Sequence, residues 1–250
     1  MRRSLIPLSF AASVLASGLA AAQTPVPASP LTGNMSLVSE YRFRGIDQTF
    51  GKPALQGGFD YSHSSGVYLG NWNSNVSEGA GFPGSNLEMD FYGGWKKSFG
   101  DFGLDLGAIY YWYPGTDNPK IDNKEIYIGG SWKMLSAKYF HSLDDYFGVA
   151  NTKNSWYLDL GLTWDLGGGL GLVAHYGIFE FKNVANGDYN DWKLGVTYDL
   201  KGWVFGAAYV DSDAKGNCAT AELYCFFNDN GTKTRDAGRS TIVFSVMKTF

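Results

Sequence analysis

The sequence predicts an all-β fold: a transmembrane, antiparallel, up-and-down β-barrel of about 12 strands with both termini in the periplasm. Three observations support this prediction. Segments of about ten residues alternate apolar and polar side chains, because each strand of such a barrel faces lipid on one side and a polar lumen on the other. Short and long connections alternate between these segments. The chain of 250 residues is also rich in Gly (33) and in the aromatic residues Phe (17), Tyr (16) and Trp (8).

The N-terminus has the pattern of a secretory signal peptide. Arg2 and Arg3 precede an apolar run over residues 5–19, and Ala20 to Ala22 offer a small-residue cleavage site. We therefore expect three parts: a signal peptide over 1–22, a proline-containing periplasmic lead over 23–33, and the barrel over 34–250.

The alternation defines the strands and their two faces. The first expected strand, 35–44, places Glu40, Arg42 and Arg44 on one face and Leu37 and Phe43 on the other. A helix with a period of 3.6 residues could not separate these residues in this way. The remaining strands are expected near residues 53–62, 67–73, 87–96, 102–112, 125–132, 135–141, 156–164, 170–179, 190–199, 203–211 and 239–250.

The connections provide an independent test of this topology. Short joints are expected at 63–66, 96–101, 133–134, 165–169 and 201–202, and longer ones near 45–52, 74–86, 113–124, 142–154, 180–189 and 212–238. Bacterial outer-membrane barrels have short periplasmic turns and longer external loops. The alternation thus predicts an even number of strands and six external loops.

Tryptophan indicates which face meets the lipid, because its amphipathic ring favours the boundary between hydrocarbon and water. All eight Trp residues, Trp72 among them, fall on the phase that we assign to the lipid, and Tyr68 is expected in the periplasmic girdle. The alternative is a soluble barrel or sandwich whose apolar phase packs inside. Aromatic residues at two heights favour the membrane barrel.

The last strand ends on Phe250 and resembles the C-terminal signature by which the outer-membrane assembly machinery recognises its substrates. Lys248 departs from the usual apolar residue at its position. Because it lies near the chain end, we expect its ammonium group to reach the periplasmic rim.

Three stretches carry a family resemblance: N-M-S-L-V-S-E-Y-R-F-R-G at 34–45, G-K-P-A-L-Q-G-G-F-D-Y at 51–61, and G-V-Y-L-G-N-W at 66–72. Together they resemble the TorF family, a proteobacterial group of porin-like proteins. The likeness covers nearly all the mature chain. It implies a barrel in the outer membrane of a Gram-negative bacterium, and it brings no catalytic residue and no assigned substrate.

The inward phase holds the candidate functional residues, since rings of charge tune which solutes enter a pore. The residues predicted to line the pore are Glu40, Arg42, Arg44, Asp60, Glu88, Asp90, Lys96, Asp105, Glu125, Lys138, Asp159, His175, Asp191 and Lys193. Their acidic excess suggests a preference for cations or neutral polar solutes. A salt-bridge network that fills the barrel is the alternative. Inward glycines such as Gly94 and Gly107 are expected to widen the lumen, and inward tyrosines to narrow it.

Other chemistry finds little support in the sequence. His175 and Asp159 should lie nearly opposite each other, but no nucleophile accompanies them, so we expect no enzyme. His141, Asp144 and Asp145 are expected in a solvated loop, and we predict no metal site and no cofactor. The acidic balance, 24 acidic against 20 basic residues, argues against nucleic-acid binding.

Cys218 and Cys225 both fall in the longest external loop, where a disulfide is the natural expectation. The sequence therefore predicts a passive channel for small hydrophilic solutes or ions in contact with outer-membrane lipid. The alternative is a non-conducting structural or adhesion barrel whose external loops bind partners.

Overall fold

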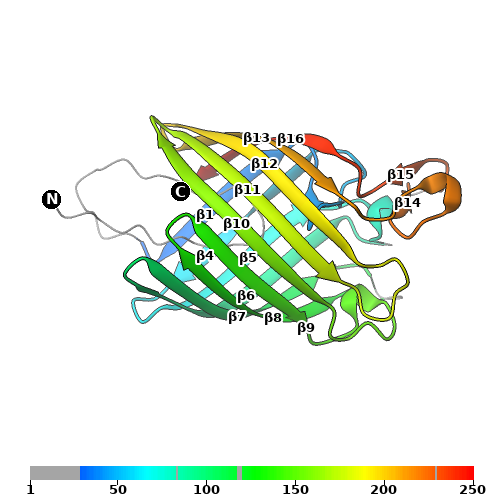
Figure 1. Ribbon diagram of the computed structural model, residues 1–250, viewed down its shortest axis with the longest axis horizontal. Helices are drawn as coiled ribbons and strands as arrows, with labels where there is room; N and C mark the ends of the chain where they lie inside the picture. Colours follow the sequence, from blue (N-terminus) through cyan, green and yellow to red (C-terminus); the bar gives the residue numbers. More distant parts are fainter. Residues whose placement is uncertain (1–28, 83, 117–119, 229) are drawn as a thin grey trace.

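The computed structural model describes residues 29–82, 84–116, 120–228 and 230–250. The expected signal peptide and most of the expected lead lie outside the described residues. Within them, the chain forms a closed antiparallel barrel of twelve strands, as predicted, in the order β1-β4-β5-β6-β7-β8-β9-β10-β11-β12-β13-β16 (Figure 1). Pairing of the first strand with the last closes the wall, from Asn34 opposite Thr249 to Val38 opposite Ser245.

The wall strands are β1 (Leu31–Val38), β4 (Ala54–Ser62), β5 (Val67–Asn75), β6 (Leu87–Phe99), β7 (Phe102–Trp112), β8 (Asn123–Trp132), β9 (Leu135–Ser142), β10 (Trp156–Gly167), β11 (Leu170–Glu180), β12 (Tyr189–Leu200), β13 (Trp203–Ser212) and β16 (Thr241–Thr249). Two short hairpins are not part of the wall: β2 (Arg42–Phe43) pairs with β3 (Ile46–Asp47), and β14 (Cys225–Phe227) pairs with β15 (Thr234–Asp236). Three single-turn helices lie in loops, η1 (Glu78–Ala80), η2 (Tyr146–Gly148) and η3 (Cys218–Thr220). No helix in the described part of the chain is long and apolar enough to span a membrane.

The two ends of the barrel differ, as the alternating connection lengths predict. One end, here called the turn end, carries the short turns and the C-terminus; the other, the loop end, carries the long connections with β14 and β15 (Figure 1). Cys218 and Cys225 form the expected disulfide in the last loop, with their Cα atoms 5.0 Å apart.

The first strand is the main correction to the predicted elements. It begins at Leu31, inside the expected lead, and ends at Val38 rather than at Arg44. Its ladder with β4 ends at the pair Val38 and Ala54, next to Pro53, which has no N–H to donate. Residues 39–53 leave the wall and fold as a separate segment, here called the inner hairpin. The sequence predicts residues 39–44 in the first strand, 45–52 in an external loop and 53 at the start of the second strand.

The apolar phase of most strands faces outward, as predicted. Leu69 and Phe59 expose 61% and 58% of their surface on the outside of the wall. The ammonium group of Lys248 reaches an end of the barrel, since its Nζ donates to the backbone oxygen of Lys201 in a turn at the turn end. That this end is periplasmic stays a prediction.

Trp72 and Tyr68 contradict the face assignment of β5. Trp72 is 5% exposed and lies opposite Asp90, an inward residue of β6, while Tyr68 is 6% exposed and hydrogen bonds to Asp105. Directly paired residues of neighbouring strands point to the same side of a sheet. Both aromatic side chains therefore face the lumen, and the outward phase of β5 carries Asn71 and Asn73 instead.

Candidate functional site in the barrel lumen

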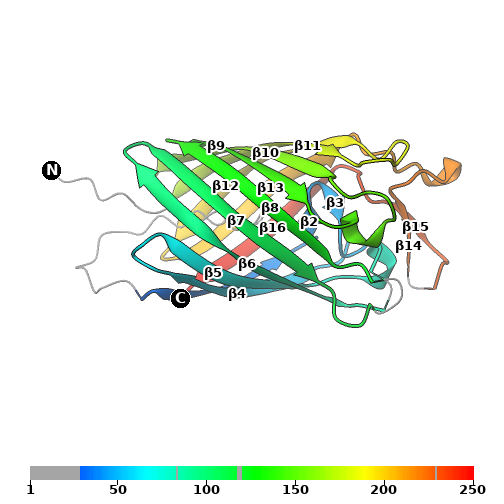
Figure 2. The ribbon, with the colours of Figure 1, turned by 90° about the horizontal axis from the view of Figure 1, so that it is seen from below.

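The inner hairpin enters the barrel because it makes its own compact turn. Arg44 and Gly45 have φ angles of 49° and 79°, the positive values that a tight two-residue hairpin turn requires. The backbone N–H of Gln48 donates to the oxygen of Tyr41, and Thr49 Oγ1 accepts from the N–H of Tyr41. Figure 2 shows β2 and β3 within the outline of the barrel, near the loop end.

The tip of the hairpin reaches the far side of the lumen. The hairpin leaves from β1, yet a Cβ atom on Gly45 would lie 2.5 Å from Cβ of Asp191 in β12. Arg44 Nη1 and Nη2 donate to Glu125 Oε1 and Oε2 in β8, at 3.0 and 2.6 Å. Both side chains are almost fully buried, and the Arg44 guanidinium lies 4.5 Å from the ring centroid of Tyr157. This bidentate ion pair holds the tip of the hairpin against the opposite wall.

A second group of ion pairs holds the base of the hairpin to the last loop. Arg235 in β15 donates through Nε to Asp47 Oδ2 at 2.6 Å and through Nη2 to Glu40 Oε2 at 3.1 Å. Arg239 reaches the same Glu40 oxygen at 3.2 Å, and Arg42 pairs with the other oxygen of Glu40. The loop that carries the disulfide therefore fixes the inner hairpin from the outer side.

Aromatic rings fill the space around the hairpin. Phe43 packs edge-on against Tyr111 of β7 and against Phe147 of η2, with centroids 5.5 and 6.0 Å apart. Tyr146 continues this contact to Phe179 of β11. Further rings in contact are Tyr41 with Trp72, Tyr113 with Phe147, Phe140 with Tyr157, Phe179 with Tyr189, and Tyr189 with Tyr224. The rings around Phe43 and Tyr146 join β7, β11 and β12 through loop residues, and the other ring pairs lie beside them, so the loop half of the lumen is packed.

Gly94 and Gly107 do not widen the lumen, which corrects the expectation for these two glycines. A Cβ atom on Gly94 would lie 2.7 Å from the hydroxyl oxygen of Tyr68, and one on Gly107 would lie 2.4 Å from that of Tyr127. Each of these glycines is the direct cross-strand neighbour of the tyrosine that covers it. The glycines therefore give the tyrosine rings room to lie flat on the wall, as aromatic residues do beside glycines in sheets.

Charged side chains form a belt along the inner side of the wall, between the packed loop half of the lumen and the turn end. Lys96 lies opposite Asp105, Gly129 lies opposite both Asp105 and Lys138, and Lys138 lies opposite Asp159. Because Gly129 has no side chain, Lys138 Nζ reaches across it to Asp105 Oδ2 at 2.7 Å. The belt thus alternates positive and negative groups from β6 to β10.

His175 of β11 continues the belt. Its Nδ1 lies 2.9 Å from Asp159 Oδ1 and its Nε2 lies 2.8 Å from Asp191 Oδ1. The Tyr157 hydroxyl donates to the other oxygen of Asp191 at 2.8 Å, and Lys193 is the direct cross-strand neighbour of His175. The expected approach of His175 and Asp159 is confirmed, and two carboxylates rather than one hold the ring.

The structure separates the predicted luminal residues into three groups. Glu40, Arg42 and Arg44 belong to the inner hairpin rather than to a wall strand. Glu88, Asp90 and Glu125 are buried in the wall around it. The other eight, Asp60, Lys96, Asp105, Lys138, Asp159, His175, Asp191 and Lys193, form or adjoin the charge belt.

Sequence reasoning missed the loop residues that complete the packed half, above all Asp47, Tyr146 and Arg235. Only Asp47 lies in a stretch with a sequence signal, the R-F-R-G-I-D run at 42–47, which combines charges with a glycine at a tight turn. Their partners are up to 195 residues away, as in the contact of Glu40 with Arg235, and no local pattern marks such a contact.

The expected solvated-loop group does not assemble into a cation site. Asp144 pairs with Lys124 at 2.9 Å, Asp145 Oδ1 accepts from the backbone of Thr152, and His141 lies beside Asn154. Throughout the described residues, no three His, Cys, Asp or Glu side chains are grouped to hold a metal ion.

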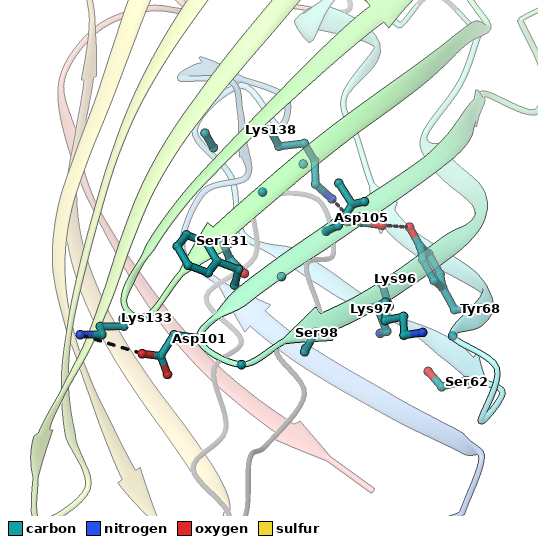
Figure 3. Close-up of a pocket in the computed structure, with 18 of the residues that line it drawn as sticks. Ser62, Tyr68, Lys96, Lys97, Ser98, Asp101, Asp105, Ser131, Lys133 and Lys138 are labelled. Carbon is teal, nitrogen blue, oxygen red and sulfur yellow. Dashed lines mark hydrogen bonds and ion pairs between the residues drawn. The ribbon is translucent and has the colours of Figure 1, made fainter.

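A cavity of about 420 Å³ opens at the turn end, below the charge belt (Figure 3). Strands β4 to β9 and their turns form its walls. Its polar side chains include Asp60, Lys96, Asp105 and Lys138, and the Tyr68 hydroxyl donates to Asp105 Oδ1 at 2.6 Å. The lumen therefore combines a packed loop half with a polar space at the opposite end.

Comparison with known proteins assigns the family. Residues 21–250 match the family described as "Bacterial protein of unknown function (Gcw_chp)". The chain belongs to this family. The match does not confirm the TorF name, which stays a prediction. No curated protein matches the sequence.

Solved porin structures share the fold of this Gcw_chp member. The KdgM porin in complex with disordered oligogalacturonate aligns with a TM-score of 0.52 and 8% identity, over 88% of this chain and 97% of that chain. The NanC porin aligns with a TM-score of 0.51 and 10% identity, over 88% of this chain and 98% of that chain. At these identities the likeness concerns the fold alone.

Proposed function

We propose that the protein is an outer-membrane channel for passive passage of small polar solutes or ions, with the inner hairpin as the closure at its external end. The outward apolar side chains fit a lipid environment, and the short turns fit a periplasmic turn end with both chain termini. β16, which precedes the terminal Phe250, is the segment we propose for recognition by the assembly machinery.

One observation carries this proposal: the lumen is closed by a segment that is not part of the wall. The inner hairpin is held by side-chain ion pairs and ring contacts, whereas the wall is held by continuous backbone ladders. A hairpin held in this way can leave without breaking the barrel. The charge belt and the cavity would then form one polar path.

A second candidate function is a permanently closed barrel whose external loops bind partners. The packing of the loop half favours it, since Tyr111 and Glu125 are each only 1% exposed. The two candidates differ in one measurable property, the passage of ions.

Planar-bilayer recordings of the purified protein test the proposal. We expect rare openings for the unmodified barrel and a large gain in open time when residues 42–47 are replaced by a short Gly-Ser linker. A matched control shortens the exposed turn 230–233 between β14 and β15, which does not enter the lumen. If both the unmodified and the linker barrels are folded yet silent, the channel proposal fails and the closed barrel is favoured.

A further inference from the structure

Lys96 of β6 is a half-buried cation that lines the turn-end cavity. Among the described residues, no carboxylate forms an ion pair with its ammonium group, and its contact is with the face of Tyr68, 5.0 Å from the ring centroid. Figure 3 shows Lys96 in the group of side chains around the cavity, near Tyr68. A half-buried ammonium that makes no direct ion pair keeps its hydrogen-bond donors available to an anionic ligand.

The two carboxylates nearest in the wall are already engaged. Asp105 accepts from the Tyr68 hydroxyl at 2.6 Å and from Lys138 Nζ at 2.7 Å. Asp60 accepts from the Tyr92 hydroxyl at 2.7 Å. The Lys138 contact offsets the charge of Asp105, whereas the neutral Tyr92 hydroxyl leaves the charge of Asp60 in place. Neither carboxylate forms an ion pair or a hydrogen bond with Lys96, so the donors of its ammonium group remain available to a ligand in the cavity.

The remaining walls suit a small hydroxylated molecule. Ser62, Ser98 and Ser131 contribute hydroxyl groups, and Gly103 and Gly129 contribute inward positions without side chains. Pockets that bind small ligands occupy about 300–1,000 Å³, and this cavity of about 420 Å³ lies in that range.

We propose that the cavity is a binding site for a small organic carboxylate that carries hydroxyl groups, with its carboxylate on Lys96 and its hydroxyls on the serines. Its meaning as a solute site rests on the proposed channel, but binding itself does not require conduction. The site would hold the solute at the turn end of the lumen.

Calorimetric titration of the folded barrel in detergent tests the site with gluconate as the probe. Sorbitol, of similar size with a hydroxyl in place of the carboxylate, tests the need for charge. Lys96→Gln should weaken gluconate binding by at least about tenfold, the usual loss for one charge-assisted contact. Lys96→Arg should retain binding. Lys201→Gln, which removes an exposed lysine in a turn outside the cavity, should leave the affinity unchanged.

Each outcome decides the inference separately from the channel. Gluconate binding that Lys96→Gln abolishes and Lys96→Arg keeps supports the site even if bilayer recordings are silent. Absence of gluconate binding to a folded barrel, equal binding of sorbitol, or full affinity in Lys96→Gln overturns it, even if the barrel conducts. A difference in migration between unheated and heated samples on denaturing gels shows that each variant is folded before titration.

Discussion

The ion pair between Arg44 and Glu125 should control how often the inner hairpin leaves the lumen. Replacing Glu125 by Gln keeps the size of the side chain and removes its charge, so the Arg44 guanidinium stays buried without its carboxylate. Removing one partner of a buried ion pair costs about 3–5 kcal/mol. Arg44 keeps the Tyr146 hydroxyl at 3.0 Å and the face of Tyr157, so we expect the lower value, about 3 kcal/mol.

This loss bears on the closed conformation alone, because an open hairpin exposes Arg44 to water. A change of about 3 kcal/mol shifts the ratio of closed to open barrels roughly 100-fold, since about 1.4 kcal/mol is a factor of ten. Single-channel recordings in planar bilayers measure that ratio as the open probability. We expect a rise close to this factor for Glu125→Gln.

Asp144→Asn is the matched control for this experiment. It makes the same carboxylate-to-amide change in an ion pair with Lys124, but both side chains are more than half exposed. Exposed pairs contribute about 0–1 kcal/mol, so the open probability should change little. Equal open probability in folded Glu125→Gln, in the control and in the unmodified barrel would refute the reasoning that this ion pair holds the closure.

Three further predictions concern other parts of the barrel. Gly94→Ala should lower the urea midpoint of unfolding by an amount equivalent to about 1–3 kcal/mol, because its Cβ atom would lie 2.2 Å from the Leu106 backbone oxygen. The control Gly130→Ala, whose Cβ atom would have its nearest neighbour at 4.0 Å, should leave the midpoint unchanged. Equal midpoints in the two variants would contradict the packing described. Reduction of the disulfide between Cys218 and Cys225, seven residues apart, should destabilise the folded last loop by about 2.5 kcal/mol, the loop-closure entropy that the disulfide removes from the unfolded loop. Proteolysis in the last loop should then be faster. Unchanged cleavage would show that other contacts are enough to hold the loop. Brominated lipids quench the fluorescence of tryptophans that face the lipid. Trp72→Phe should leave the quenched fraction of the fluorescence unchanged, whereas Trp112→Phe, the control at a tryptophan that faces outward, should reduce it. The reverse result would place Trp72 in the lipid.

The wall of the barrel could be predicted from the sequence because it depends on local patterns. A strand alternates its two faces at every residue, so a lipid-facing apolar side is visible within ten residues, as in β16 with Ile242 and Phe244 exposed. Turn and loop lengths then fix the order of strands. The number of strands, their pairing order and the disulfide all follow from such local signals.

β5 marks the limit of this reasoning. One of its phases carries Val67, Leu69, Asn71 and Asn73, and the other carries Tyr68, Gly70, Trp72 and Ser74, so neither phase is clearly apolar. Period two separates the phases but does not say which one faces outward. The register with β6 decides it, because Trp72 lies opposite the inward Asp90.

The sequence by itself thus determined a twelve-stranded wall with an apolar exterior and a charged interior. The two faces follow from the alternation along each strand, and the number of strands follows from the turns and loops between them. Only the tertiary structure decided where residues 39–53 lie. Their place depends on Glu125, Asp191 and Arg235, which come from β8, β12 and β15. Contacts between residues so distant in the chain leave no period in the sequence, and they form only once the closed wall brings those strands around the same space.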